Sequence, residues 1–73
     1  MGSDGEVIQV VVNGKSRQVP DGRTVFALLE DLGLDPGGVV VEHNRQILER
    51  ASLAEVRLGA GDVLEIVHFV GGG

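Results

Sequence analysis

The sequence contains no cysteine, which excludes a disulfide framework, a thiolate nucleophile and a zinc–thiolate site. This lack is typical of a reducing compartment, and we expect a cytoplasmic protein. Tryptophan and tyrosine are also missing, and the two aromatic residues are phenylalanines. The six basic residues stand singly along the chain. Nucleic-acid binding relies on clustered positive charge and aromatic stacking, so we expect no nucleic-acid partner.

Long apolar runs are missing as well. No stretch approaches the roughly 20 apolar residues of a membrane span, and the first residues lack the pattern of a signal peptide. We therefore expect no membrane partner, and we interpret residues 1–5 as a disordered leader or a cloning scar. With 73 residues and a net charge of −5, the chain predicts one small acidic domain over residues 6–69.

Glycine, in contrast, is abundant, with 12 residues, and the last three positions are Gly71, Gly72 and Gly73. The apolar segment 63–70 reads as a strand that leads directly into them. Glycine has no Cβ and tolerates almost any φ and ψ, so such an arm can enter a slot too narrow for side chains. We predict a flexible C-terminal tail over residues 70–73 with the Gly73 carboxylate as the functional group. The alternative is a frayed, inert end.

Turn and cap signals divide the rest of the chain. Asn13-Gly14 predicts a type I′ turn between strands 6–12 and 15–19. Thr24 is a suitable helix N-cap, and Gly33 is placed to end a helix of about nine residues. The apolar positions between them have the spacing of one helix face: Val25, Leu28, Leu29 and Leu32.

The second half predicts further strands. Residues 35–38 read as a loop, and the valines at 39–41 predict a central strand, 39–42, that is buried on both faces. A turn at Asn44-Arg45 leads to a short strand at 47–48, and a helical turn is expected around residues 52–55. The order predicts an α+β, ubiquitin-like β-grasp fold. It has a mixed sheet of four to five strands, one main helix on one face, and parallel first and last strands in the middle.

The last strand also predicts a docking surface. If Leu64 and Ile66 face the helix, then Val67 and Phe69 lie on the opposite face together with Val63 and Glu65. Exposed apolar side chains beside the tail are typical of a partner site. The predicted partner-binding residues are Val67, Phe69, Val70, Gly71 and Gly72.

Other candidate sites are weaker. His43 and His68 have no neighbours at ligand spacing, so no metal site is expected. Gly59-Ala60-Gly61 begins like a phosphate-binding loop but precedes a strand and opens no helix, so a turn is predicted. The acidic residues around the helix are interpreted as a solvated rim: Asp21, Glu30, Asp31 and Asp35.

Several motifs resemble those of one family. The final segment carries Leu58, Gly61-Asp62, Glu65-Ile66 and the run from Val70 to Gly73. This resembles the ends of the thiamin-pathway sulfur carriers, the ThiS family. Matching upstream motifs are Val12-Asn13-Gly14, Pro20-Asp21-Gly22-x-Thr24-Val25-x-x-Leu28-Leu29 and Val41-x-x-Asn44-x-x-Ile47-x-x-Arg50. The sequence departs from the family pattern at Glu49, where proline is frequent, and at Ser52 and Leu53, where an aromatic residue or histidine is frequent.

The resemblance implies a carrier rather than an enzyme. An E1-like adenylating enzyme of the ThiF type would use ATP to adenylate the Gly73 carboxylate, and a sulfur donor system would convert it to a thiocarboxylate. A thiazole synthase of the ThiG type would take the sulfur. No bound cofactor is implied.

Two alternatives remain open. The first is the same chemistry for another acceptor, as in a molybdopterin-type carrier or a ubiquitin-like modifier. The ending Val70-Gly71-Gly72-Gly73 argues against a molybdopterin-type carrier, which usually ends in Ala-Gly-Gly or similar residues. The second is a β-grasp interaction module with an inert tail.

Overall fold

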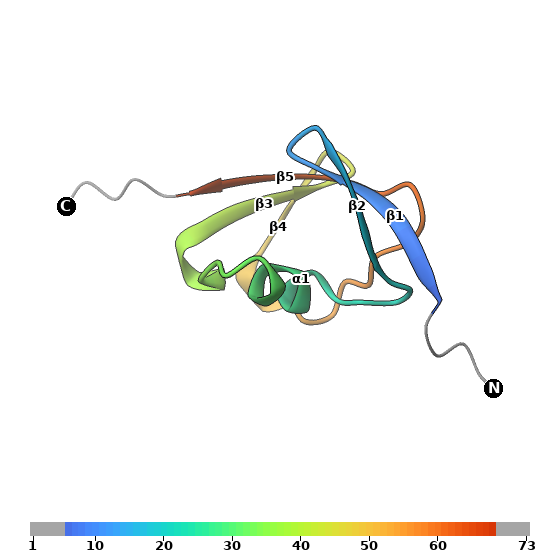
Figure 1. Ribbon diagram of the computed structural model, residues 1–73. Helices are drawn as coiled ribbons and strands as arrows, with labels where there is room; N and C mark the ends of the chain where they lie inside the picture. The colour runs from blue at the N-terminus through green and yellow to red at the C-terminus, as the bar shows by residue number, and fades with distance from the viewer. Residues whose placement is uncertain (1–5, 69–73) are drawn as a thin grey trace.

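A computed structural model describes residues 6–68 of the chain. It contains five strands, one α-helix and two short 3₁₀ helices (Figure 1). Their bounds are β1 Val7–Val12, β2 Lys15–Pro20, α1 Val25–Asp31, η1 Pro36–Gly38, β3 Val39–His43, β4 Gln46–Leu48, η2 Arg50–Ser52 and β5 Val63–His68. The predicted strand–helix order is confirmed, and α1 is seven residues long rather than about nine.

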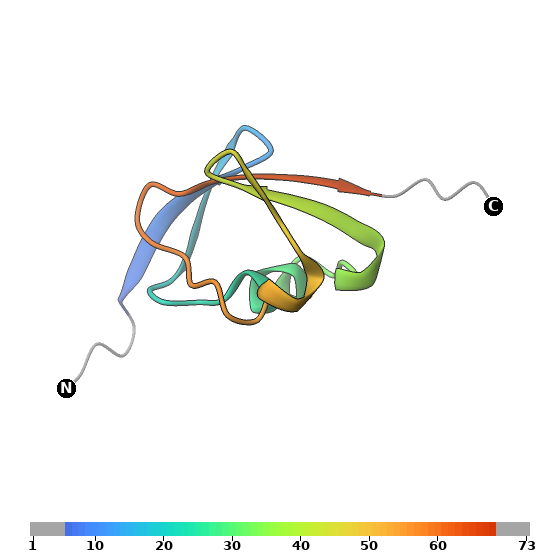
Figure 2. The same ribbon diagram turned by 180° about the vertical axis from the view of Figure 1, so that it is seen from behind.

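The five strands form one mixed sheet in the order β2-β1-β5-β3-β4. β1 and β5 are parallel, as predicted, while the other three pairs are antiparallel. α1 lies on one side of this sheet, and the views from front and back agree that it covers a single face (Figures 1 and 2). The sheet therefore has one covered face and one open face.

Two tight hairpins set the strand registers. Asn13 and Gly14 have φ of 51° and 83° and join Val12 to its partner Lys15, which confirms the predicted turn. The β3–β4 hairpin is equally tight. Its central residues, Asn44 and Arg45, have φ of 49° and 73°. Arginine is uncommon in this left-handed region, whereas asparagine enters it more readily.

Side chains at the start and glycine at the end fix α1. The Thr24 hydroxyl accepts a hydrogen bond from the Ala27 N–H at 3.1 Å, so Thr24 is the predicted N-cap. Gly33, with φ of 76°, ends the helix. The N–H groups of Gly33 and Leu34 bond the carbonyls of Glu30 and Leu29, which is the Schellman pattern.

The core lies between α1 and the covered face of the sheet. Its buried members are all apolar, and no polar or charged residue is buried within residues 6–68. The buried residues are Val10, Val19, Val25, Leu28, Leu29, Val39, Val41, Leu53, Leu58, Leu64 and Ile66. Burial of such side chains is the main stabilising contribution in so small a domain.

Two of the expectations for the second half of the chain need correction, and a third is confirmed. Residues 36–38 form a 3₁₀ turn rather than a plain loop, because Asp35 caps the N–H of Gly37 and Pro36 supplies a helical φ. The helical turn expected around residues 52–55 is present, since the N–H groups of Glu55 and Val56 bond the Ser52 carbonyl, and η2 directly precedes it. β3 is an interior strand but not the middle one, and Val40 is only half-buried because α1 covers just one face.

Candidate functional site

Buried and exposed side chains alternate along β5, and the exposed ones belong to the open face of the sheet. Leu64 and Ile66 point into the core, with 0% and 9% of their surface exposed, whereas Val63 and Val67 are 43% and 61% exposed. Side chains two residues apart on a strand share a face, so Val63, Glu65 and Val67 form one row. The prediction that this face of β5 is exposed is confirmed for Val63 to Val67. Phe69 lies outside the described residues.

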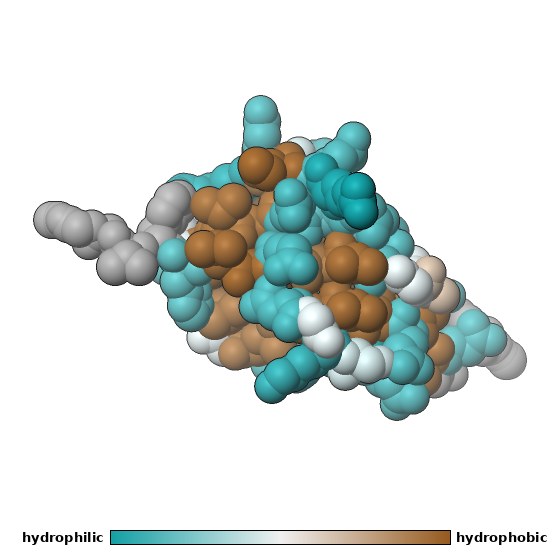
Figure 3. Space-filling model, turned by 90° about the horizontal axis from the view of Figure 1, so that it is seen from above, coloured by the Kyte–Doolittle hydropathy of each residue, from teal (hydrophilic) through white to brown (hydrophobic). Residues whose placement is uncertain are grey.

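Neighbouring strands extend this row into a patch. Val40 and Glu42 of β3 lie opposite Val67 and Glu65, and Ile47 of β4 lies opposite Glu42. Ile47 is 70% exposed. We define the open-face patch by these six residues: Val40, Glu42, Ile47, Val63, Glu65 and Val67. Figure 3 shows this side of the sheet, where hydrophobic side chains gather in separate clusters with hydrophilic ones between them.

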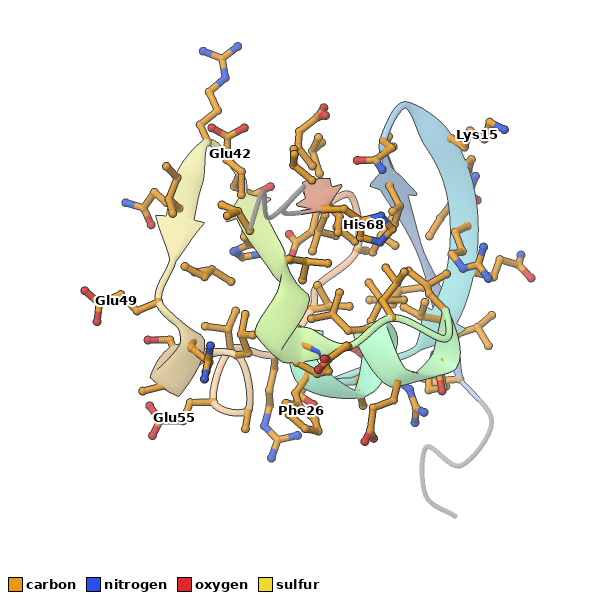
Figure 4. All side chains as sticks on the ribbon, turned by 90° about the vertical axis from the view of Figure 1, so that its left-hand side faces the viewer. Lys15, Phe26, Glu42, Glu49, Glu55 and His68 are labelled. Carbon is orange, nitrogen blue, oxygen red and sulfur yellow. The ribbon has the colours of Figure 1, made fainter. Side chains whose placement is uncertain are left out.

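The strand that leads to the predicted tail is firmly anchored. β1 and β3 flank β5, and the Asn13 side chain holds it beyond the end of β1. The Asn13 Oδ1 accepts from the Ile66 N–H at 2.7 Å, and Nδ2 donates to the Ile66 carbonyl at 3.2 Å. One turn residue thus replaces a backbone partner of Ile66. The described chain stops two residues further on, at His68, whose side chain is exposed (Figure 4).

The predicted reactive end is outside the described residues. This applies to Gly73, the proposed site of adenylation, and to Val70, Gly71 and Gly72 of the predicted partner-binding set. Val67 is the predicted partner-binding residue that the structure describes, and it stands on the open-face patch.

A polar cluster of His43, Asn44 and Asp62 joins the start of β5 to the end of β3. The His43 Nε2 lies 2.7 Å from Asp62 Oδ2, and each side chain is 17% exposed. The Asp62 carboxylate also accepts from the Gly59 N–H at 2.9 Å and from Asn44 Nδ2 at 3.3 Å. The Asn44 Oδ1 in turn accepts from the Val63 N–H at 2.9 Å. An ionised carboxylate only accepts hydrogen bonds, so His43 donates from Nε2.

Burial and hydrogen bonding act in opposite directions on Asp62. Partial burial raises the pKa of its carboxyl, but hydrogen bonds from His43, Gly59 and Asn44 lower it further, so the net pKa is below its usual value. The hydrogen bonds of this cluster tie the β3–β4 turn to the residues that precede and begin β5, so the cluster has a structural role. The sequence alone does not predict this cluster, because His43 and Asp62 are 19 residues apart and only the β3–β5 register brings them together.

Few other sites compete with the patch. No group of three or more His, Cys, Asp or Glu side chains within residues 6–68 is placed to hold a metal ion. Asp31 forms a two-pronged ion pair with Arg23, with distances of 2.6 and 2.7 Å, so this part of the acidic rim is structural. Across the same described segment, no helix is long and apolar enough to cross a bilayer. The turn predicted at residues 59–62 is present, with Gly61 at φ 85°.

A parallel β1–β5 pair at the centre of a mixed sheet, one covering helix and an initial hairpin define the class. It is the ubiquitin-like β-grasp class. Within that class the chain belongs to the ThiS family, whose model matches residues 5–73.

Individual relatives agree with this assignment. The sulfur carrier protein ThiS of Bacillus subtilis is 43% identical over 63 residues, which are 85% of this chain and 96% of that protein. The crystal structure of a thiamine biosynthesis protein (ThiS) from Geobacter metallireducens superposes with a TM-score of 0.78 at 33% identity, covering 90% of this chain and all of that one. The predicted family and β-grasp fold are therefore confirmed.

A second kind of relative is longer. A thiazole synthase of Paramagnetospirillum magneticum is 46% identical over 66 residues, and one of Magnetococcus marinus is 36% identical over the same length. The matched segment is 90% of this chain but 20% of each synthase, so the chain spans about a fifth of their length. In these relatives, a segment similar to this chain is part of a protein named for thiazole formation.

Proposed function

We propose that the chain is a sulfur carrier whose Gly73 carboxylate is adenylated and converted to a thiocarboxylate, which then donates sulfur for thiazole formation in thiamin biosynthesis. The observation that carries this proposal is the family match, which continues through Gly73. Two further similarities support it: one relative is named a sulfur carrier, and two are named thiazole synthases.

The chemistry follows from the weakness of a carboxylate as an electrophile. In the proposed first step, Gly73 attacks the α-phosphorus of ATP on an E1-like, ThiF-type enzyme, and pyrophosphate leaves. A persulfide from the donor system then attacks the acyl carbon and AMP leaves. A thiol then attacks the inner sulfur of the resulting acyl disulfide, so the S–S bond breaks, the thiocarboxylate leaves with the outer sulfur, and the thiol and the inner sulfur form a new disulfide. Glycine at the reacting position places no side chain beside the attacking group.

The chain itself contributes position rather than catalysis. β5 holds Val67 and His68 at the edge of a folded domain, and the chain continues from there toward Gly73. We propose that the adenylating enzyme docks on the open-face patch and on Phe69, and that residues 70–73 enter its active site. The enzyme supplies ATP binding, acid and base, and a ThiG-type thiazole synthase is the proposed acceptor.

Intact mass spectrometry tests this proposal. The chain is incubated with the adenylating enzyme of its own source, ATP and a persulfide donor. We expect one oxygen to be replaced by one sulfur. The control is the chain extended by one residue after Gly73, which places the reactive carboxyl in the wrong position. An unchanged mass for the native chain under conditions where the enzyme binds ATP would contradict the proposal.

A further inference from the structure

The open-face patch contains two carboxylates directly opposite each other. Glu42 of β3 and Glu65 of β5 are register partners in an antiparallel pair. The backbone N–H and C=O of Ile66 are directed to Asn13, so those of Glu65 point the other way, toward β3. Glu42 and Glu65 are therefore a hydrogen-bonded pair, with Cα atoms about 5.5 Å apart and both side chains on the open face.

Such a pair has an energetic cost. Like charges directly opposite each other on a sheet repel, and this lowers stability. Among the described residues, neither carboxylate takes part in an ion pair or a side-chain hydrogen bond. Arg45 of the β3–β4 turn lines a shallow hollow with both glutamates but pairs with neither. Within residues 6–68, the two adjacent acceptors therefore have no ion-pair partner, although Arg45 lies beside them.

The two carboxylates line two hollows of different character. On one side, Val40, Ile47 and Val67 line a hollow of about 190 Å³ together with both glutamates. On the other side, Val63 lines the second hollow together with the same two glutamates and with Asn44 and Arg45. Glu42 and Glu65 thus stand between an apolar hollow on one side and a more polar one on the other. In Figure 4, the Glu42 side chain points away from the helix, toward the open side.

We propose that Glu42 and Glu65 jointly bind one arginine guanidinium of the adenylating enzyme when that enzyme covers the open-face patch. The planar guanidinium has five N–H donors in a fork, so it can bond two carboxylates at once, whereas an ammonium acts as a point charge. The aliphatic part of the arginine side chain would pack in the hollow lined by Val40, Ile47 and Val67. The inference rests on the proposed function for the identity of this partner.

Charge argues against a second copy of the chain as the occupant. The chain carries a net charge of −5, and two copies docked by this face would bring together four carboxylates. No lysine or arginine occupies an open-face strand position within residues 6–68, and the two Arg45 side chains of the flanking turns would offset at most half of these four charges. A basic partner surface instead gains from electrostatic complementarity, which selects partners and speeds their encounter.

The test compares glutamate-to-glutamine variants in direct binding to the adenylating enzyme by calorimetry, without ATP. We expect Glu42→Gln and Glu65→Gln each to raise Kd several-fold, and the double variant to raise it on the order of tenfold or more. The wild-type Kd should also rise more steeply with salt than that of the double variant, because the charged contact is screened. The control is a double variant of Glu49 and Glu55 to glutamine, two exposed residues that lie away from Glu42 in Figure 4.

Stability and sulfur loading separate the possible explanations. The thermal midpoint of the Glu42 and Glu65 double variant should be equal to or above that of the wild type, so weaker binding is not due to unfolding. The arginine contact would be overturned if the Glu42 and Glu65 double variant had the same Kd as the wild type or as the control double variant. It would also be overturned if the wild-type chain did not bind the enzyme. Thiocarboxylate formation is measured separately by intact mass, so the sulfur-carrier proposal can fail or hold independently.

Discussion

The two faces of the sheet contain similar aliphatic side chains in very different surroundings. Adjacent residues on β5 illustrate this, since Leu64 is fully buried and Val63 is 43% exposed. The covered face packs against α1 and the segment that contains Leu53 and Leu58. The open face has no such cover within the described chain. Hydrophobicity alone therefore does not separate side chains that stabilise the domain from those that remain available for recognition.

The distribution of charge sharpens the contrast. The covered face buries no charged group in the described region, so it carries no desolvation cost. The open face places Glu42 opposite Glu65, an arrangement that opposes stability. A sheet face that is only exposed to solvent requires neither exposed valines nor a pair of facing carboxylates. Both features are accounted for if a partner protein covers this face.

The largest expected effect comes from truncating the covered face. Leu64→Ala should lower the free energy of unfolding by about 3 kcal/mol, because it removes a fully buried side chain and leaves a cavity. The matched change on the open face of the same strand, Val67→Ala, should shift it by no more than about 0.5 kcal/mol. Urea unfolding measures both. Equal losses would show that the open face is also part of the stabilising core.

The next largest effect should come from the polar cluster of His43, Asn44 and Asp62, which helps to fix the β3–β5 register. Asp62→Ala should lower stability at neutral pH by about 2 kcal/mol, because three donors lose their shared acceptor. A one-residue slip between strands would exchange the two faces, so this register defines which side chains are exposed. Unfolding free energies at pH 7, measured for variant and wild type, test the contribution.

Acid should remove this difference. The folded-state pKa of Asp62 is lowered, so its contribution is complete above the unfolded pKa of about 3.9 and is lost as the pH falls through the folded value. Wild type and Asp62→Ala should therefore converge in stability at low pH. Asp31→Ala is the control, since its ion pair with Arg23 is exposed and should contribute much less. A gap between wild type and Asp62→Ala that persists unchanged into strong acid would contradict this role for the Asp62 charge.

Local signals predicted most of the fold. Asn13-Gly14, Thr24 and Gly33 each specify a backbone geometry through their own chemistry, and the structure contains all three. Side chains that meet across strands were not predicted, because the strand register is needed to pair them. Asn13 and Ile66 are 53 residues apart.

The lack of information on strand pairing and on the layers that cover the sheet also explains two other differences. These are the incorrect expectation for Val40 of β3 and the unpredicted Glu42–Glu65 pair. A run of three valines cannot show whether a second layer covers the sheet, so Val40 was expected to be buried. The exposed row on β5 was predicted from its alternation alone. The Glu42–Glu65 pair was not, because its two residues lie on different strands and only the sheet pairing places them together.

The smallest change in stability should accompany a clear change in recognition. Ile47→Ser and Val67→Ser alter side chains that are 70% and 61% exposed, so each should shift the free energy of unfolding by no more than about 0.5 kcal/mol. If the adenylating enzyme covers the patch, each should nevertheless raise its KM for the carrier, because apolar contact area is lost. Steady-state release of pyrophosphate measures this KM.

Val7→Ser provides the matched control for these two variants. Val7 is 55% exposed, but it lies at the start of β1, outside the patch and opposite Pro20 of the edge strand β2. We expect its KM to equal that of the wild type. Equal increases for all three variants would mean that general surface polarity, rather than the patch, governs docking. An unchanged KM for Ile47→Ser and Val67→Ser would leave the open face without a role in activation.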